Sequence, residues 1–235
     1  MRLRAVRSCR QMRCAKGKVR TTKEMRQTEY EGGLCGVSYE EFYKARRDEL
    51  AGRVGARRLA HIDGVADTAE QLARVYGEDP RRARLAGLLH DWDKGFNDED
   101  IRKRADELGM QVSPYVREYM ARLLHGPTAA VALARAYPQI DPAVVQAISR
   151  HTTAAIDMTP LDMIVYTADV IEPHRAFSGL APLRDAVGKV SLEELFFMAF
   201  AYTMESVMRR KKNLYPNTVD VWNYYVDRRR ARGGR

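Results

Sequence analysis

From residue 38 onward, the apolar positions of this chain recur at the spacing of α-helices. The clearest case covers about residues 56–76, where one apolar stripe contains Leu59, Ile62, Val65, Ala69, Leu72 and Val75. We find no convincing alternation of apolar and polar residues bounded by turn signals, and no internal repeat or persistent heptad. The pattern therefore predicts an all-α fold, a globular bundle of about nine or ten helices.

Capping residues and prolines mark where these helices begin and end. Two capping boxes, each a Ser followed three residues later by a Glu, predict helix starts at Ser38 and Ser191. One helix is expected to end at His125-Gly126 and the next to begin at Pro127, because Gly favours helix ends and Pro favours helix starts. Further starts are predicted at Asp79-Pro80, Asn97, Ser113-Pro114, Asp141-Pro142, Thr159-Pro160 and Thr218.

Composition alone fits an ordinary globular protein, but the charge is unevenly distributed. The 235 residues are 45% hydrophobic and 30% charged, with a formal net charge of +9. Residues 1–28 contain ten Lys or Arg and one acid, Glu24, so the net charge of this segment, +9, equals that of the whole chain. Residues 228–235 add five Arg, which leaves residues 29–227 with a net charge of −5. The basic character therefore belongs to the two ends of the chain.

We accordingly divide the chain into a basic flexible arm at residues 1–37, a helical domain at 38–227 and an Arg-rich tail at 228–235. Nucleic acid is not expected as a partner except through residues 1–28, which contain no aromatic side chain for base stacking. No run of about 18 apolar residues predicts a membrane span, and the N-terminus lacks the apolar stretch of a secretory signal. The spacing of the three cysteines matches no zinc ribbon, and their odd number does not fit a set of disulfides. They indicate a reducing compartment, so we expect a cytoplasmic protein.

The candidate chemistry lies in histidines and acids at unusual positions. Asp91 follows His90 at the end of an apolar helix, where an acid opposes the helix macrodipole and needs a compensating cation. Asp169 lies in the nearly apolar segment 165–171, where a lone carboxylate is costly unless it is paired or bound to metal. Imidazole and carboxylate groups together suit Fe, Mn, Zn or Ni. The histidines at particular points of predicted helices are His61, His90, His125 and His151.

These residues resemble a known family. His61, His90-Asp91 and Asp169 match the H…HD…D signature of HD-domain metal-dependent phosphohydrolases, an all-helical superfamily. The local context resembles the YqeK family, whose members are bacterial symmetrical diadenosine tetraphosphate hydrolases. The stretches that carry this resemblance are RLAHIDGVADTA at 58–69, LAGLLHDWDK at 85–94, LLHGP at 123–127, HTT at 151–153 and YTADVIEP at 166–173. The resemblance covers about residues 38–225 and leaves the basic arm unexplained.

The resemblance implies a site and a reaction for residues 38–227. Its implied metal ligands are His61, His90, Asp91, His125, His151 and Asp169, a six-residue site for two metals. Iron is the expected metal, and manganese or another divalent transition metal is the alternative. A metal-bound water would attack an inner phosphorus and release two ADP. Asp91 and Lys94 are the implied catalytic residues, and the candidates for substrate binding are Arg58, Lys94, Thr152, Thr153 and Arg175.

Two residues depart from the family pattern, and two other functions stay open. His174 stands where a small residue commonly follows Glu-Pro, and Asp93 stands where an uncharged residue is usual. We expect His174 at the surface or the pocket rim, without a ligand role. Another HD-type phosphohydrolase, acting on a different nucleotide or a signalling nucleotide, is the first alternative, because a fold does not fix a substrate. An RNA- or membrane-binding module that uses the basic arm is the second. The sequence also leaves base preference and homodimer formation open.

Overall fold

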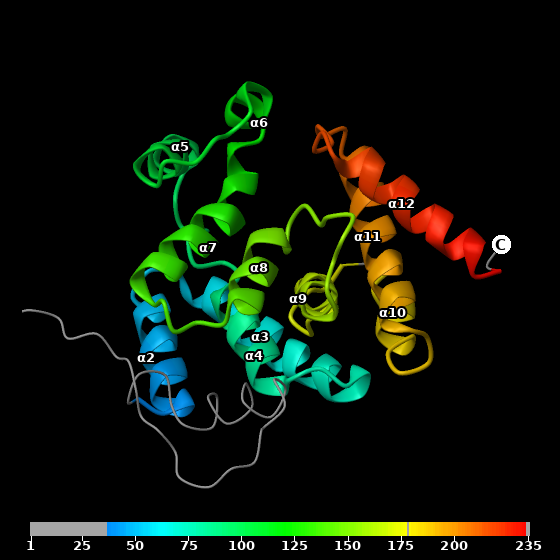
Figure 1. Cartoon of the computed structure of the whole chain (residues 1–235), viewed down its shortest axis with the longest axis horizontal. Coiled ribbons are helices and arrows are strands. Elements are labelled where there is room, and N and C mark those ends of the chain that lie inside the picture. The colour runs from blue at the N-terminus through cyan, green and yellow to red at the C-terminus, as the bar shows by residue number, and fades with distance from the viewer. Residues whose placement is uncertain (1–36, 178, 234–235) are drawn as a thin grey trace, which may run out of the picture. The chain divides into compact units, whose positions relative to one another are not determined.

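The computed structural model describes residues 37–177 and 179–233. Within these ranges the chain folds into eleven α-helices and one 3-10 helix, without a β-sheet, which confirms the all-α prediction (Figure 1). Apart from Val37, the predicted basic arm and its cysteines lie outside the described residues. The helices are α2 (Tyr39–Ala51), α3 (Ala56–Tyr76), α4 (Pro80–Leu89), α5 (Asp98–Glu107), α6 (Pro114–Tyr119), η1 (Ala121–Leu124), α7 (His125–Ala136), α8 (Pro142–Arg150), α9 (Pro160–Ile171), α10 (Ala181–Asp185), α11 (Leu192–Arg209) and α12 (Thr218–Ala231).

Most helix starts follow the capping signals of the sequence. The carboxylate of Asp79 accepts two backbone N–H groups at the start of α4, and the side chain of Asn97 does the same for α5. Ser191 accepts the backbone N–H three residues later at the start of α11. A complete reciprocal capping box lies at Thr159, whose helix α9 also begins with a proline. Local side-chain chemistry therefore sets these boundaries.

The segment before α7 differs from the prediction. A single helix from Pro114 to His125 was expected, but α6 ends at Tyr119 and η1 follows it. The break lies at Met120, whose φ of −137° and ψ of 28° are not helical. As a result, His125 begins α7 instead of ending the preceding helix. The five-residue α10 was also not predicted, because it is too short to show an apolar period.

Helix α9 has neighbours on several sides and forms the centre of the packing (Figure 1). It packs against α3, α4, α8 and α11, and all but three of its twelve residues are buried. Helices α3 and α4 approach each other closely at Gly87, where a Cβ atom would lie 2.8 Å from the Cα of Ala66. These contacts bring the middle of α3 and the end of α4 to the same side of α9.

Helix α12 covers α11 through aromatic and charged contacts. The rings of Phe196 and Tyr225 lie 5.0 Å apart between their centroids. Near its C-terminal end, Arg228 forms a bidentate ion pair with Glu193 of α11. The helix continues to Ala231, beyond the boundary predicted at residue 227. In the part of the chain that the structure describes, no helix is long and apolar enough to cross a membrane.

Candidate metal centre

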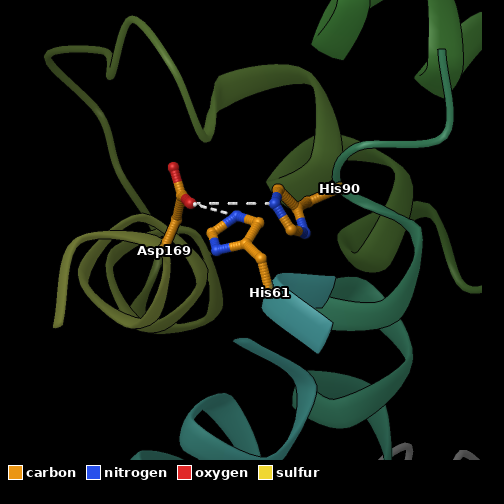
Figure 2. Close-up of side chains that lie close together, drawn as sticks. All are labelled: His61, His90 and Asp169. Atoms are coloured by element: carbon orange, nitrogen blue, oxygen red, sulfur yellow. Dashed lines mark ion pairs between the residues drawn. The ribbon is translucent and has the colours of Figure 1, made fainter. Parts of the chain in front are cut away.

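The six predicted ligands come together from five helices. His61 lies on α3, His90 and Asp91 follow the last residue of α4, His125 begins α7, His151 follows α8 and Asp169 lies on α9. Figure 2 shows His61, His90 and Asp169 pointing toward one another. The Asp169 Oδ1 atom lies 3.1 Å from Nε2 of His61 and 3.7 Å from Nε2 of His90. Residues up to 108 positions apart in sequence therefore form one cluster, in which the four histidines and Asp91 are buried and the Asp169 side chain is 21% exposed.

Asp91 lies between two pairs of histidines. Its Oδ2 atom is 3.5 Å from Nε2 of His90 and 3.8 Å from Nε2 of His61. Its Oδ1 atom is 3.1 Å from Nε2 of His125 and 3.8 Å from Nε2 of His151. Each carboxylate oxygen thus faces its own histidine pair.

The tautomer of each histidine follows from the partner of its Nδ1 atom. In His90, His125 and His151, Nδ1 lies 2.6, 2.6 and 2.7 Å from the carbonyl oxygen three residues earlier. In His61, Nδ1 lies 3.0 Å from the carboxylate oxygen Oε1 of Glu172. Carbonyl and carboxylate oxygens only accept hydrogen bonds, so each Nδ1 carries the proton. Each Nε2 atom then presents a lone pair to the cluster.

These lone pairs need a positive partner. The Nε2 atoms of His61 and His90 are buried and have no hydrogen-bond partner among the described residues. The Nε2 atoms of His125 and His151 face each other at 3.0 Å, although neither carries a proton. Buried polar atoms are rarely left without partners, and inward imidazole nitrogens beside carboxylates suit a divalent transition metal. The residues present therefore fit a divalent metal centre.

The electrostatics at Asp91, Asp169 and His151 favour the protonation states of metal ligands. Burial raises the pKa of Asp91, but its contacts with His90 and His125 and the charge of Lys94 outweigh burial and hold this pKa well below the usual range. Burial also opposes ionisation of Asp169, yet its pKa stays low because of the Arg175 charge. Burial and the neighbouring His125 lower the pKa of His151 well below its ordinary value. The carboxylates are ionised and His151 is neutral, as metal ligation requires.

Most of the predicted substrate-binding residues lie beside the cluster. The Arg58 guanidinium donates to Asp91 at 2.8 Å, and that of Arg175 donates to Asp169. The Lys94 Nζ atom lies 3.2 Å from Nε2 of His125 and 3.8 Å from Oδ1 of Asp91. The hydroxyl of Thr152 lies 3.0 Å from Nε2 of His151. Thr153 is half-buried, and the structure shows no hydrogen bond or ion pair between it and the cluster in the described residues.

The two departures from the family pattern have different positions. Asp93 is buried and faces Arg53 and Arg104 at 3.5 and 3.4 Å, so it belongs to a structural ion-pair group. The His174 side chain is 59% exposed, and its Nδ1 lies 3.1 Å from Oε2 of Glu172. Neither side chain therefore offers a ligand atom to the candidate metal centre.

Sequence reasoning missed Glu172 as a site residue. Its buried carboxylate holds His61 through Oε1, and its Oε2 accepts the backbone N–H of His174 at 2.7 Å. It is packed so tightly that a Cβ atom at Gly64 would lie 2.6 Å from Oε2. The signal was present in the sequence, because Glu172, like Asp91, is an acid at the end of an apolar helix.

A cavity of about 770 Å³ opens beside the cluster. We call it the arginine cavity, after three of the residues that line it. Its lining includes Arg57, Arg58, His61, His174, Arg175 and Phe177. Because two of these arginines also bond the carboxylates of the cluster, the cavity leads from solvent to the candidate metal centre. Its charge suits an anionic ligand.

Comparisons with known proteins identify the family of this chain. Residues 58–173 match the model of the HD domain. A protein of Staphylococcus aureus named bis(5'-nucleosyl)-tetraphosphatase, symmetrical, is 34% identical over 175 residues, which cover 72% of this chain and 87% of that protein. A protein of Halalkalibacterium halodurans with the same name is 32% identical over 166 residues, covering 71% and 87%.

A solved structure is also similar. It is described as a predicted HD superfamily hydrolase involved in NAD metabolism, from Clostridium acetobutylicum. It superposes with a TM-score of 0.74 and 34% identity, over 79% of this chain and 97% of the other. The family resemblance inferred from the sequence is thereby confirmed. The chain belongs to the HD-domain family of symmetrical bis(5'-nucleosyl)-tetraphosphatases.

Proposed function

We propose that this chain is a metal-dependent hydrolase that cleaves diadenosine tetraphosphate symmetrically into two ADP. The names of its relatives support the substrate class. The observation that carries the proposal is the convergence of four proton-free imidazole nitrogens and two carboxylates beside a cavity lined by arginines. A binding module based on residues 1–28 has no comparable support, since those residues lie outside the described part of the chain.

The ligands would hold the metal in two overlapping groups. His61, His90 and Asp169 form one group, and His90, Asp91 and His151 form the other, with His125 beside Asp91. A divalent metal bound there would supply an activated water and would neutralise charge on the phosphate under attack. We propose iron, with manganese as the alternative, because both accept this set of nitrogen and oxygen donors.

The cations around the cluster would bind and orient the polyphosphate. The Lys94 side chain is 30% exposed and lies at the His125 side of Asp91, where its ammonium can meet phosphate as a point charge. Arg58 and Arg175 line the arginine cavity and also pair with the carboxylates of Asp91 and Asp169. The Thr152 hydroxyl offers a hydrogen bond next to His151. These groups hold the substrate so that an inner phosphorus faces the ligands.

Product identification tests the proposal. The full chain, prepared anaerobically with Fe²⁺ or with Mn²⁺, is incubated with diadenosine tetraphosphate, and the products are separated by ion-exchange chromatography. We expect ADP as the sole product. ATP together with AMP, or no product with either metal, would refute the proposal. A panel of mononucleotides and signalling nucleotides tests the alternative HD-type activity, and Asp91→Ala is the control that should lose metal and turnover together.

Two further properties belong to this proposal. We propose a cytoplasmic location, which fractionation of the source cells would test.

We also propose that any homodimer forms without a shared site, because the six ligands of one chain already converge. Light scattering at increasing protein concentration, followed together with specific activity, would test this: activity that appears only in the dimer contradicts it.

A further inference from the structure

The arginine cavity contains an exposed aromatic ring that neither the metal centre nor the packing explains. Phe177 is 59% exposed and lies in the loop that follows α9. Among the large hydrophobic side chains exposed in the described residues, it is the one that lines this cavity. A ligand with a flat apolar face could stack on this ring while its charged groups meet the arginines of the same cavity.

Arg175 connects this ring to the metal centre. Its guanidinium bonds the carboxylate of Asp169, and its Cζ atom lies 5.9 Å from the centroid of the Phe177 ring. One guanidinium group therefore separates the ring from a candidate metal ligand. The same cavity thus offers cations beside the cluster and, on the far side of Arg175 from Asp169, the aromatic face of Phe177.

This order of groups matches the order of groups in a nucleotide. Phosphates are recognised by arginine and metal, whereas a base presents a flat π face that stacks on aromatic side chains. A ligand with its inner phosphates at the cluster would extend a ribose and a base along the cavity toward Phe177. An inorganic polyphosphate could use the arginines but would leave the ring uncovered.

We propose that Phe177 is a stacking platform for one nucleobase of the substrate, an inference that rests on the proposed hydrolysis of dinucleoside tetraphosphates. Every base has a π face, so stacking holds a nucleoside without selecting adenine over guanine. The platform consequently favours dinucleotides over inorganic polyphosphates and gives little preference between purines.

Binding of ADP and of inorganic pyrophosphate separates the ring from the cations. Both ligands are titrated calorimetrically into the metal-loaded full chain and its variants. Phe177→Ala should weaken ADP binding by about 5- to 150-fold, the range measured for losing one stacked base, and leave pyrophosphate binding unchanged. Phe177→Trp should restore or tighten ADP binding. Met208→Ala is the matched control, since Met208 is 53% exposed and does not line the cavity.

Kinetics with diadenosine tetraphosphate give the second readout. Stacking present equally in the ground state and transition state predicts that Phe177→Ala raises KM and leaves kcat nearly unchanged. Unchanged ADP binding in Phe177→Ala, or equal loss of ADP and pyrophosphate, would overturn the platform. The wild-type product test decides the proposed function separately: a wild type that cleaves the substrate while Phe177→Ala binds ADP normally contradicts the platform alone. A wild type that neither cleaves the substrate nor binds ADP contradicts both.

Discussion

Replacing Glu172 by Gln should weaken metal binding without unfolding the protein. The Glu172 carboxylate has two acceptor oxygens in use: Oε1 accepts from Nδ1 of His61 at 3.0 Å, and Oε2 accepts the backbone N–H of His174 at 2.7 Å. Glutamine has nearly the same shape but offers one oxygen and one NH₂ group. The backbone N–H of His174 can only donate, so the amide oxygen must face it.

The NH₂ group of the glutamine would then face His61. An NH₂ donor opposite Nδ1 favours the tautomer with the proton on Nε2, and this Nε2 is the atom that points toward Asp169. A protonated Nε2 cannot ligate a metal. Loss of such supporting carboxylates typically reduces metal affinity about 10- to 100-fold, equal to about 1.4–2.7 kcal/mol. We expect a loss in this range for Glu172→Gln.

Metal affinity is measured by competition with a chelator and elemental analysis, and folding by thermal denaturation. Asp162→Asn provides the matched control, because Asp162 is a buried carboxylate on α9, the helix that Glu172 follows, and it contacts Gln146 and Arg150 instead of the cluster. The control should keep its metal. Affinity within twofold of the wild type in Glu172→Gln would refute the reasoning, and equal metal loss in both variants would show a general effect of losing a buried carboxylate.

Three further predictions concern packing, substrate binding and pH. Gly87→Ala places a Cβ atom 2.8 Å from the Cα of Ala66, so it should lower the free energy of unfolding by about 1–3 kcal/mol in urea denaturation. Lys94→Ala should lower kcat/KM by about 10- to 150-fold through loss of a charged phosphate contact, while metal content by elemental analysis stays near that of the wild type. Burial raises the pKa of Glu193, but its pKa is lowered overall by the hydrogen bond and charge of Arg228. The ionised Glu193 therefore stabilises the fold fully at a pH above the pKa that this residue has in the unfolded chain. This stabilisation is lost as the pH falls through the lower pKa of Glu193 in the folded protein. Melting temperatures between pH 7 and pH 3 should show a shallower acid-side decline in Glu193→Gln than in the wild type; equal declines would contradict this.

Much of the fold could be predicted from the sequence because helix boundaries depend on near neighbours. Asp79 and Asn97 cap their own helices through backbone groups two and three residues away. Such interactions are the same in any tertiary structure that retains the helix. The break at Met120 was missed because no capping residue or proline marks it, and it places His125 at the start of α7.

The sequence by itself also singled out Asp91, which opposes the helix macrodipole, and Asp169, which lies in a nearly apolar segment, while the family resemblance implied the full ligand set. Only the tertiary structure decided what these residues do together. It placed Glu172 against His61 across 111 positions of sequence, set Asp91 between two histidine pairs, and brought Phe177 into the cavity beside Arg175. The physical reason is one of distance along the chain: capping and helix periodicity act within about four residues, whereas the packing of α3, α4, α7, α8 and α9 determines which distant side chains meet.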